Sequence, residues 1–208
     1  MSPDVPTLHD HEIHVWRLPW ASDAAGAPPF QALLAAYAGP GAPEVARGEH
    51  GKPYFTGEFG ALGFSWSHSR DTALFAVGRG PVGFEVGVDV ERVRPRARSL
   101  ELASRFFAPA EAAWLSALPA EGVLRGFLDL WTAKEAVLKA HGGGLSYGLH
   151  RVAFSQGEGG RVVPVVFDGD VAPASAWQVE PLTFEPGLVA AVAWRGEPRT
   201  VRVFTFGL

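Results

Sequence analysis

Residues 131–139 read Trp-Thr-Ala-Lys-Glu-Ala-Val-Leu-Lys, a charged segment set among apolar residues. In an α-helix, Trp131, Glu135 and Lys139 are spaced four residues apart and therefore stack on one face. Apolar neighbours such as Leu138 would anchor the helix in a core, so that a carboxylate and an ammonium project from its edge. The segment is either a fixed catalytic pair or an ordinary helix whose Glu-to-Lys pair is worth about 0.2–0.5 kcal/mol.

Lysine is scarce in this chain, and its placement favours the catalytic interpretation. Of the 18 basic residues, only Lys52, Lys134 and Lys139 are lysines, and the others are arginines. A lysine retained against this bias supplies a compact, flexible point charge, which suits a phosphate or a leaving group better than a planar guanidinium does. Two of the three lysines lie in the segment quoted above.

The composition favours a globular enzyme or binding protein over fibrous and disordered classes. The chain has 208 residues, 47% of them hydrophobic, enough to bury a core as one domain or as two closely packed halves. A formal net charge of -4 argues against a nucleic-acid-binding protein, and the absence of cysteine excludes disulfides. No apolar run approaches the ~20 residues of a membrane span, and no signal pattern opens the chain. We therefore expect a cytoplasmic protein without membrane contact.

The hydrophobic periodicity predicts a chain of mixed α and β content. Helices are predicted over residues 30–38, 100–107, 109–118 and 121–141. Strands are predicted over residues 12–18, 72–77, 84–91, 152–154, 162–167, 177–182, 188–194 and 201–206.

The strand at 84–91 carries a second candidate site. Its even-numbered residues are apolar, whereas Glu85, Gly87, Asp89 and Glu91 lie on the opposite face. Carboxylates two residues apart on a strand lie about 7 Å from each other, a separation that one hard cation could bridge directly or through water. The other reading is the solvent-facing side of an amphipathic strand.

Together these segments resemble the 4′-phosphopantetheinyl transferases, specifically the longer surfactin-synthetase-activating type. The motifs that carry the resemblance occur in the family's order over about a hundred central residues: Gly51-Lys52-Pro53, Ser67-His68-Ser69, Gly87-Val88-Asp89-Val90-Glu91, Phe106-Phe107 with Glu111, and residues 131–139. The pairing of the Gly-Val-Asp-Val-Glu strand with the Trp-x-x-Lys-Glu-x-x-x-Lys helix is the most specific of these features.

The resemblance implies an α+β fold that is a pseudo-dimer of two similar α/β subdomains, with the active site at their interface. We place the N-terminal subdomain at residues 1–95 and the C-terminal subdomain at residues 96–208, joined through the arginine-rich connector at 92–99. The protein is expected to be a monomer.

The implied reaction transfers the phosphopantetheine arm of coenzyme A to a serine of an acyl- or peptidyl-carrier protein and releases adenosine 3′,5′-bisphosphate. Magnesium, with manganese as an alternative, would bind Asp89, Glu91 and Glu135. Glu135 is the candidate general base, and Lys139 would stabilise the departing phosphate. The residues expected to bind coenzyme A are Lys52, Pro53, Ser67, His68, Lys134 and Lys139.

One feature departs from this family type, whose members usually carry an arginine-rich helix before Gly-Lys-Pro. Here residues 30–38 are apolar and without a positive charge. This departure motivates one alternative to the transferase, a non-catalytic protein that binds coenzyme A or carrier domains. A separate alternative is a magnesium-dependent phosphodiesterase.

Overall fold

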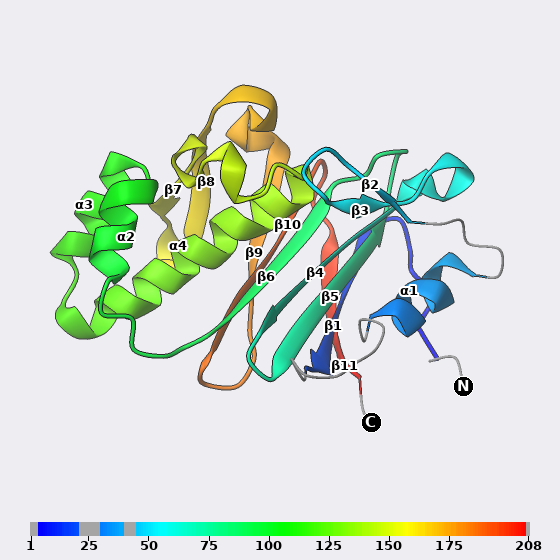
Figure 1. Cartoon of the computed structure of the whole chain (residues 1–208), viewed down its shortest axis with the longest axis horizontal. Helices are drawn as coiled ribbons and strands as arrows, with labels where there is room; N and C mark the ends of the chain where they lie inside the picture. Colours follow the sequence, from blue (N-terminus) through cyan, green and yellow to red (C-terminus); the bar gives the residue numbers. More distant parts are fainter. Residues whose placement is uncertain (1–3, 21–29, 40–44, 207–208) are drawn as a thin grey trace.

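The computed structural model describes residues 4–20, 30–39 and 45–206, which form two β-sheets flanked by helices (Figure 1). The helices are α1 (Gln31–Ala38), α2 (Ser99–Phe106), α3 (Pro109–Ala117) and α4 (Ala120–His141). The strands are β1 (Glu12–Pro19), β2 (Ala46–Arg47), β3 (Pro53–Tyr54), β4 (Leu62–Ser69), β5 (Thr72–Arg79), β6 (Val86–Arg92), β7 (Val152–Gln156), β8 (Val162–Phe167), β9 (Trp177–Leu182), β10 (Leu188–Arg195) and β11 (Thr200–Thr205). The predicted mixture of helices and strands is thus confirmed.

The strands form one four-stranded sheet and one three-stranded sheet, together with two short two-stranded ribbons. The first sheet has the order β11-β1-β5-β4, with β11 parallel to β1 and the other pairs antiparallel. The second sheet has the order β6-β10-β9 and is antiparallel. The ribbons are β2-β3 and β7-β8.

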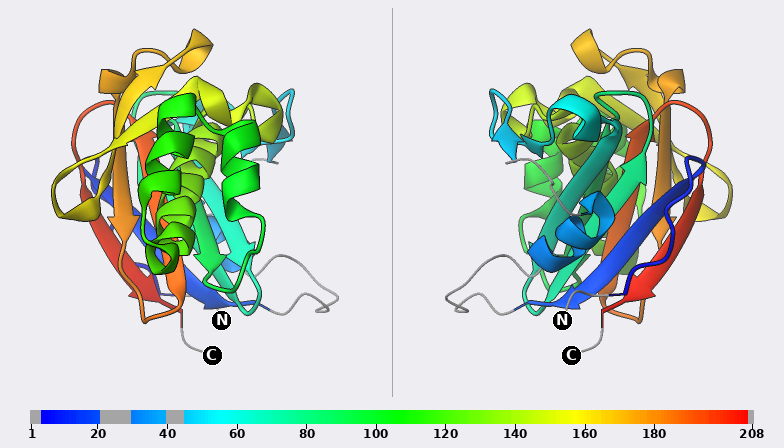
Figure 2. Two further views of the ribbon diagram at one scale, coloured as in Figure 1. Left: turned by 90° about the vertical axis from the view of Figure 1, so that its left-hand side faces the viewer. Right: turned by 90° about the vertical axis from the view of Figure 1, so that its right-hand side faces the viewer.

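The two sheets pack face to face, and helices cover their outer faces. Val15 and Leu74 of the first sheet meet Val88 and Val192 of the second in one buried cluster. The outer face of the first sheet packs on α1, and the outer face of the second packs on α4. Figure 2 shows α2, α3 and α4 together at one end of the molecule. Alternation along the strands explains this arrangement, because each buried strand presents one apolar face to each neighbouring layer.

Helix α4 is the longest helix, and its sequence explains its length. Apolar residues recur at helical spacing over its 22 residues, and the residues that face the core are fully buried. The helix ends at Gly142, whose φ of 91° is a left-handed conformation that glycine adopts without a steric penalty. The sequence prediction of a helix over 121–141 is confirmed to within one residue.

Strand pairing crosses the predicted subdomain boundary at residue 95 in both directions. β6 lies before the boundary and pairs with β10, which lies after it. β11 comes from the end of the chain and pairs with β1. Each of the two sheets thus combines strands from before and after residue 95. The division into two subdomains stays a prediction.

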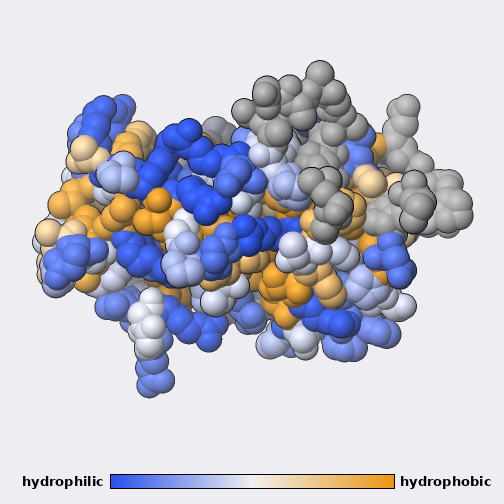
Figure 3. All heavy atoms as spheres, turned by 90° about the horizontal axis from the view of Figure 1, so that it is seen from below, coloured by the Kyte–Doolittle hydropathy of each residue, from blue (hydrophilic) through white to orange (hydrophobic). Residues whose placement is uncertain are grey.

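Figure 3 shows one face of the molecule, where polar side chains are interspersed with apolar ones. Among the described residues, none of the helices combines the length and the apolar composition that crossing a membrane requires.

Candidate active site

A close approach between β6 and α4 creates the candidate active site. A Cβ atom added at Gly87 would lie 2.0 Å from the carbonyl oxygen of Ala136 and 2.4 Å from the backbone nitrogen of Ala140. Only glycine allows this approach, since any side chain would push the helix away from the strand. Asp89, two residues along the same face of β6, is thereby held next to α4.

Asp89 is buried, with 5% of its surface exposed, and its two oxygens have different surroundings. Oδ1 accepts hydrogen bonds from Ser67 Oγ at 2.7 Å and from Lys139 Nζ at 2.7 Å. Oδ2 is buried and has no hydrogen-bond partner among the described groups. Burial raises the pKa of Asp89, and Lys139 and Ser67 oppose that rise. The carboxylate thus keeps one oxygen free for a further positive group.

Glu135 of α4 lies close to Asp89 and is also buried, with 8% of its surface exposed. Burial, followed by repulsion from the Asp89 charge, raises the pKa of Glu135 to about 7. Such a carboxylate exchanges its proton near neutral pH, which is what a general base requires. The repulsion also shows that residues 46 positions apart in the chain meet at one place.

Glu91, the third predicted metal ligand, points to different partners. Its carboxylate accepts a hydrogen bond from Ser69 Oγ at 3.1 Å and forms an ion pair with Arg96 at 2.8 Å. Across the part of the chain that the structure describes, no group of three His, Cys, Asp or Glu side chains is arranged to hold a metal ion. The structure therefore brings Asp89 and Glu135 together and pairs Glu91 with Arg96, while the Glu91 charge still acts on both of the other carboxyls and helps to raise their pKa values.

The pair of Asp89 and Glu135 fits a magnesium site of the kind that binds a phosphate substrate. Mg²⁺ usually takes one or two protein carboxylates and fills its other positions with water and substrate phosphates. Oδ2 of Asp89 is suited to be one of these protein ligands, because it is buried and has no partner among the described groups. A bound cation would offset the free-energy cost of burying this oxygen.

Three serines of β4 join the two sheets beside this site. Ser65 Oγ accepts a hydrogen bond from the Val88 backbone nitrogen at 3.3 Å, and Ser69 Oγ accepts one from the Arg92 nitrogen at 3.1 Å. Ser67, between them, donates to Asp89. The hydroxyls thus satisfy backbone groups on the open edge of β6. Of the three serines only Ser67 was predicted as a site residue, although Ser69 belongs to the same Ser-His-Ser motif and the alternation of serines over 65–69 was a signal for the other two.

Lys52 and Pro53 line a pocket together with Lys139. This position is compatible with their predicted role in binding coenzyme A. This pocket of about 170 Å³ is also lined by Trp66 and Leu138. Lys52 Nζ donates to the backbone carbonyls of Ala140 and Val86. Burial lowers the pKa of Lys52 to about 8.

His68 lies apart from the carboxylates, because the neighbours of Ser67 in β4 point to the opposite face of the strand. Its exposed imidazole stacks on Trp20, with ring centroids 4.3 Å apart, and on Trp66 at 5.6 Å. Trp66 also lines the 170 Å³ pocket, so the stack adjoins that pocket rather than Asp89.

The structure contradicts the prediction that Lys134 binds coenzyme A. Lys134 is fully buried, and its Nζ forms an ion pair with Glu111 at 2.7 Å. The ammonium also donates to the carbonyls of Leu149 and Val152. Because the side chain points into the core, about 100° around α4 from Glu135, its ammonium is not accessible to a ligand at Asp89 and Glu135.

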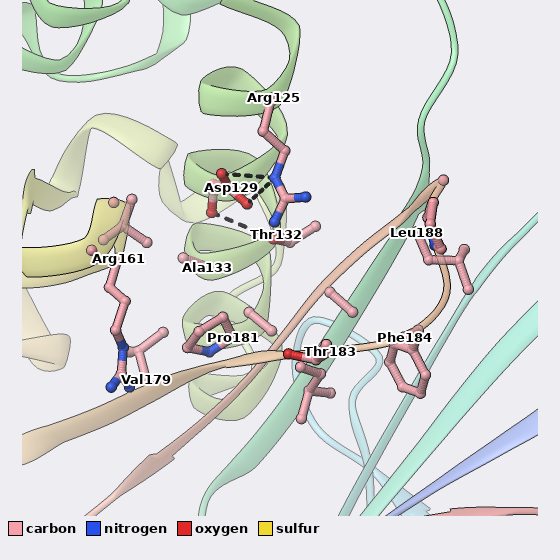
Figure 4. A pocket seen from close by; sticks show the side chains of 18 of the residues that line it. Arg125, Asp129, Thr132, Ala133, Arg161, Val179, Pro181, Thr183, Phe184 and Leu188 are labelled. Atoms are coloured by element: carbon pink, nitrogen blue, oxygen red, sulfur yellow. Dashed lines mark hydrogen bonds and ion pairs between the residues drawn. The ribbon is translucent and has the colours of Figure 1, made fainter. Parts of the chain in front are cut away.

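A second pocket, of about 470 Å³, lies between α4 and the β9-β10 hairpin (Figure 4). Its walls include Arg125, Arg161 and Phe184, and Arg125 forms an ion pair with Asp129. The paired carboxylates and the nearby lysines lie elsewhere, at β6 and the second half of α4. We therefore place the candidate chemistry at Asp89 and Glu135.

Comparisons with known proteins agree on one family. A family model described as the 4′-phosphopantetheinyl transferase superfamily matches residues 85–193. The chain is 37% identical over 126 residues to a putative 4′-phosphopantetheinyl transferase of Synechocystis sp., covering 59% of this chain and 45% of that protein. It is 32% identical over 175 residues to the 4′-phosphopantetheinyl transferase HetI of Nostoc sp., covering 67% of this chain and 73% of HetI.

Among solved structures, the chain is similar to the holo-[acyl-carrier-protein] synthase of Thermotoga maritima. The identity is 22%, the TM-score is 0.44, and the match covers 54% of this chain and 63% of the synthase. The chain spans about half the length of several of the curated relatives that it matches.

Proposed function

This chain belongs to the 4′-phosphopantetheinyl transferase superfamily, and from that premise we propose that it transfers the phosphopantetheine arm of coenzyme A to a serine of an acyl- or peptidyl-carrier protein. The observation that carries the proposal is the pair of buried carboxylates, Asp89 and Glu135, with Lys139 beside them. The by-product is adenosine 3′,5′-bisphosphate.

In this proposal Mg²⁺, or Mn²⁺, would be held by Asp89 and Glu135, and Glu91 would contribute through a bridging water. When bound, the ion would neutralise the pyrophosphate of coenzyme A and orient its phosphorus for in-line attack. The free Oδ2 of Asp89 and the raised pKa of Glu135 support this assignment, because a buried oxygen without a partner among the described groups and two carboxyls that repel each other both favour a bound cation.

Glu135 accepts the proton of the carrier serine. The serine oxygen then forms a bond to the phosphorus that bears the pantetheine arm, and the bond from that phosphorus to the oxygen bridging to the nucleotide phosphate breaks. Lys139 stabilises the negative charge on the departing phosphate. Its contact with Asp89 supports this role, since the ammonium already lies at the carboxylate that would face the pyrophosphate.

Lys52, Pro53, Ser67 and His68 bind coenzyme A in this proposal. The 170 Å³ pocket between Lys52 and Lys139 offers positive charge together with the apolar surface of Trp66, which suits a nucleotide phosphate and its base. One chain supplies both carboxylates of the site, which supports action as a monomer.

The test incubates the protein with coenzyme A, Mg²⁺ and a panel of apo carrier domains and follows carrier mass. We expect a mass gain equal to the phosphopantetheine arm, lost in Asp89→Asn and retained in Asp129→Asn, a matched change at a half-buried residue of α4 that pairs with Arg125. Binding of coenzyme A without a mass gain on any carrier would select the non-catalytic alternative. Cleavage of coenzyme A without a carrier would select the phosphodiesterase.

A further inference from the structure

The buried Lys134 uses every donor that it has. An ammonium carries three N–H groups, and its contacts are Glu111 Oε2 at 2.7 Å, the Leu149 carbonyl at 3.0 Å and the Val152 carbonyl at 2.5 Å. The aromatic rings of Phe107 and Phe154 also face it, with centroids 4.9 and 5.6 Å from Nζ.

Glu111 is equally well satisfied and connects Lys134 to the rest of the C-terminal half. Its carboxylate accepts hydrogen bonds from the Ala108 nitrogen at 2.8 Å and from the Phe154 nitrogen at 2.8 Å. One closed network therefore ties the middle of α4 to the start of α3 and to β7.

Stability alone gives a weak reason to bury such a pair. Removing two charges from water costs several kcal/mol per ion, and apolar replacements of similar volume are often as stable or more so. The network does fix the orientation of α4 relative to α3 and β7, because hydrogen bonds have a preferred geometry that apolar packing lacks.

We propose that the Lys134–Glu111 pair positions the general base by fixing the rotation of α4 about its axis. The inference rests on the proposed function. Gly87 sets how closely α4 approaches β6, and Lys134, adjacent in sequence to Glu135 but directed into the core, sets which way the helix faces. Lys134 and Glu111 are positioning residues, since neither reaches the cleft.

A small rotation of α4 would displace the Glu135 carboxylate far enough to affect catalysis. A side-chain tip lies about 5–6 Å from the helix axis, so a rotation of about 10° moves it by about 1 Å. A displacement of about 1 Å in a catalytic group costs on the order of 100-fold in rate.

The test compares the double variant Glu111→Gln/Lys134→Met with Arg125→Gln/Asp129→Asn. The first removes both buried charges, so neither is left unpaired. The control removes a charge pair from the same helix, but both of its members belong to α4 and cannot fix its rotation. Glu111→Gln/Lys134→Leu is the second test variant, because it also leaves no buried charge unpaired and gives a second apolar replacement should the first double variant not fold.

The measurements are kcat and KM for the carrier, and the affinity for coenzyme A by calorimetry with and without Mg²⁺. We expect both test variants to bind coenzyme A without Mg²⁺ to within about threefold of wild type and to lose about 10- to 100-fold in kcat. The gain in affinity on adding Mg²⁺ should shrink, and the control should match wild type throughout.

A folded test variant with wild-type kcat and wild-type Mg²⁺-linked affinity overturns the inference. A wild-type protein that transfers nothing, yet shows a Mg²⁺-linked affinity that the test variants lose, overturns the proposed function and retains the inference. Both ideas fail if coenzyme A affinity is insensitive to Mg²⁺ in the wild type and no carrier is modified.

Discussion

Replacing Glu135 by Gln should stabilise the ligand-free protein while abolishing transfer. Burial and the neighbouring Asp89 raise the pKa of Glu135 from 4.5 to about 7, which corresponds to about 3 kcal/mol of cost for carrying the charge in the folded state. Gln keeps the size of the side chain and removes the charge. We therefore expect the variant to be about 2–3 kcal/mol more stable than wild type at pH 8.

The sign of the pH dependence follows from proton binding. Between about 4.5 and about 7 the folded protein holds a proton on Glu135 that the unfolded chain has lost, so this group makes stability fall as the pH rises through that window. Below the window Glu135 is neutral in both states and the variant should match wild type. Above it the full difference should be present.

The assay is urea unfolding at pH 4.5 and pH 8 without coenzyme A or Mg²⁺, with Glu121→Gln, in the exposed first turn of the same helix, as the control. The control should retain the pH dependence of wild type. A Glu135→Gln protein that is no more stable than wild type at pH 8 would refute the reasoning, since it would mean that the Glu135 charge is already compensated in the folded protein.

Three further outcomes follow from the same geometry. Asp89→Asn should lower kcat by at least about 100-fold, and titration should show that Mg²⁺ no longer tightens coenzyme A binding. Lys139→Met should lower kcat by about 100-fold, and burst kinetics with a carrier should place the loss in the chemical step; unchanged kcat would remove Lys139 from leaving-group stabilisation. Gly87→Ala should destabilise the fold by about 3 kcal/mol or more, because its Cβ would overlap the Ala136 carbonyl; unaltered urea unfolding would contradict the tight β6–α4 contact.

Several features could be read correctly from the chain because they depend on neighbours in sequence. The helical spacing around 131–139 and the stop at Gly142 are local, and both are found in α4. The alternation of 84–91 likewise predicts which residues of β6 enter the apolar core, since Val86, Val88 and Val90 all do.

Other features depend on contacts between residues far apart, which periodicity does not specify. Lys134 looked like a phosphate ligand beside Glu135, yet 100° of helical rotation separates neighbouring side chains and directs this lysine to Glu111 in the core. The pairing of β6 with β10 and of β11 with β1 could not be predicted from the sequence either, because strand partners depend on how the two sheets pack.

The sequence by itself determined the family, the acidic strand and the helix that carries Glu135 and Lys139. The tertiary structure decided which oxygens are used: Asp89 Oδ1 is taken by Ser67 and Lys139 while Oδ2 stays free, and Glu91 turns to Arg96. The physical reason is that local spacing fixes the face on which a side chain lies, whereas its partner, its burial and its pKa arise only when distant segments pack together.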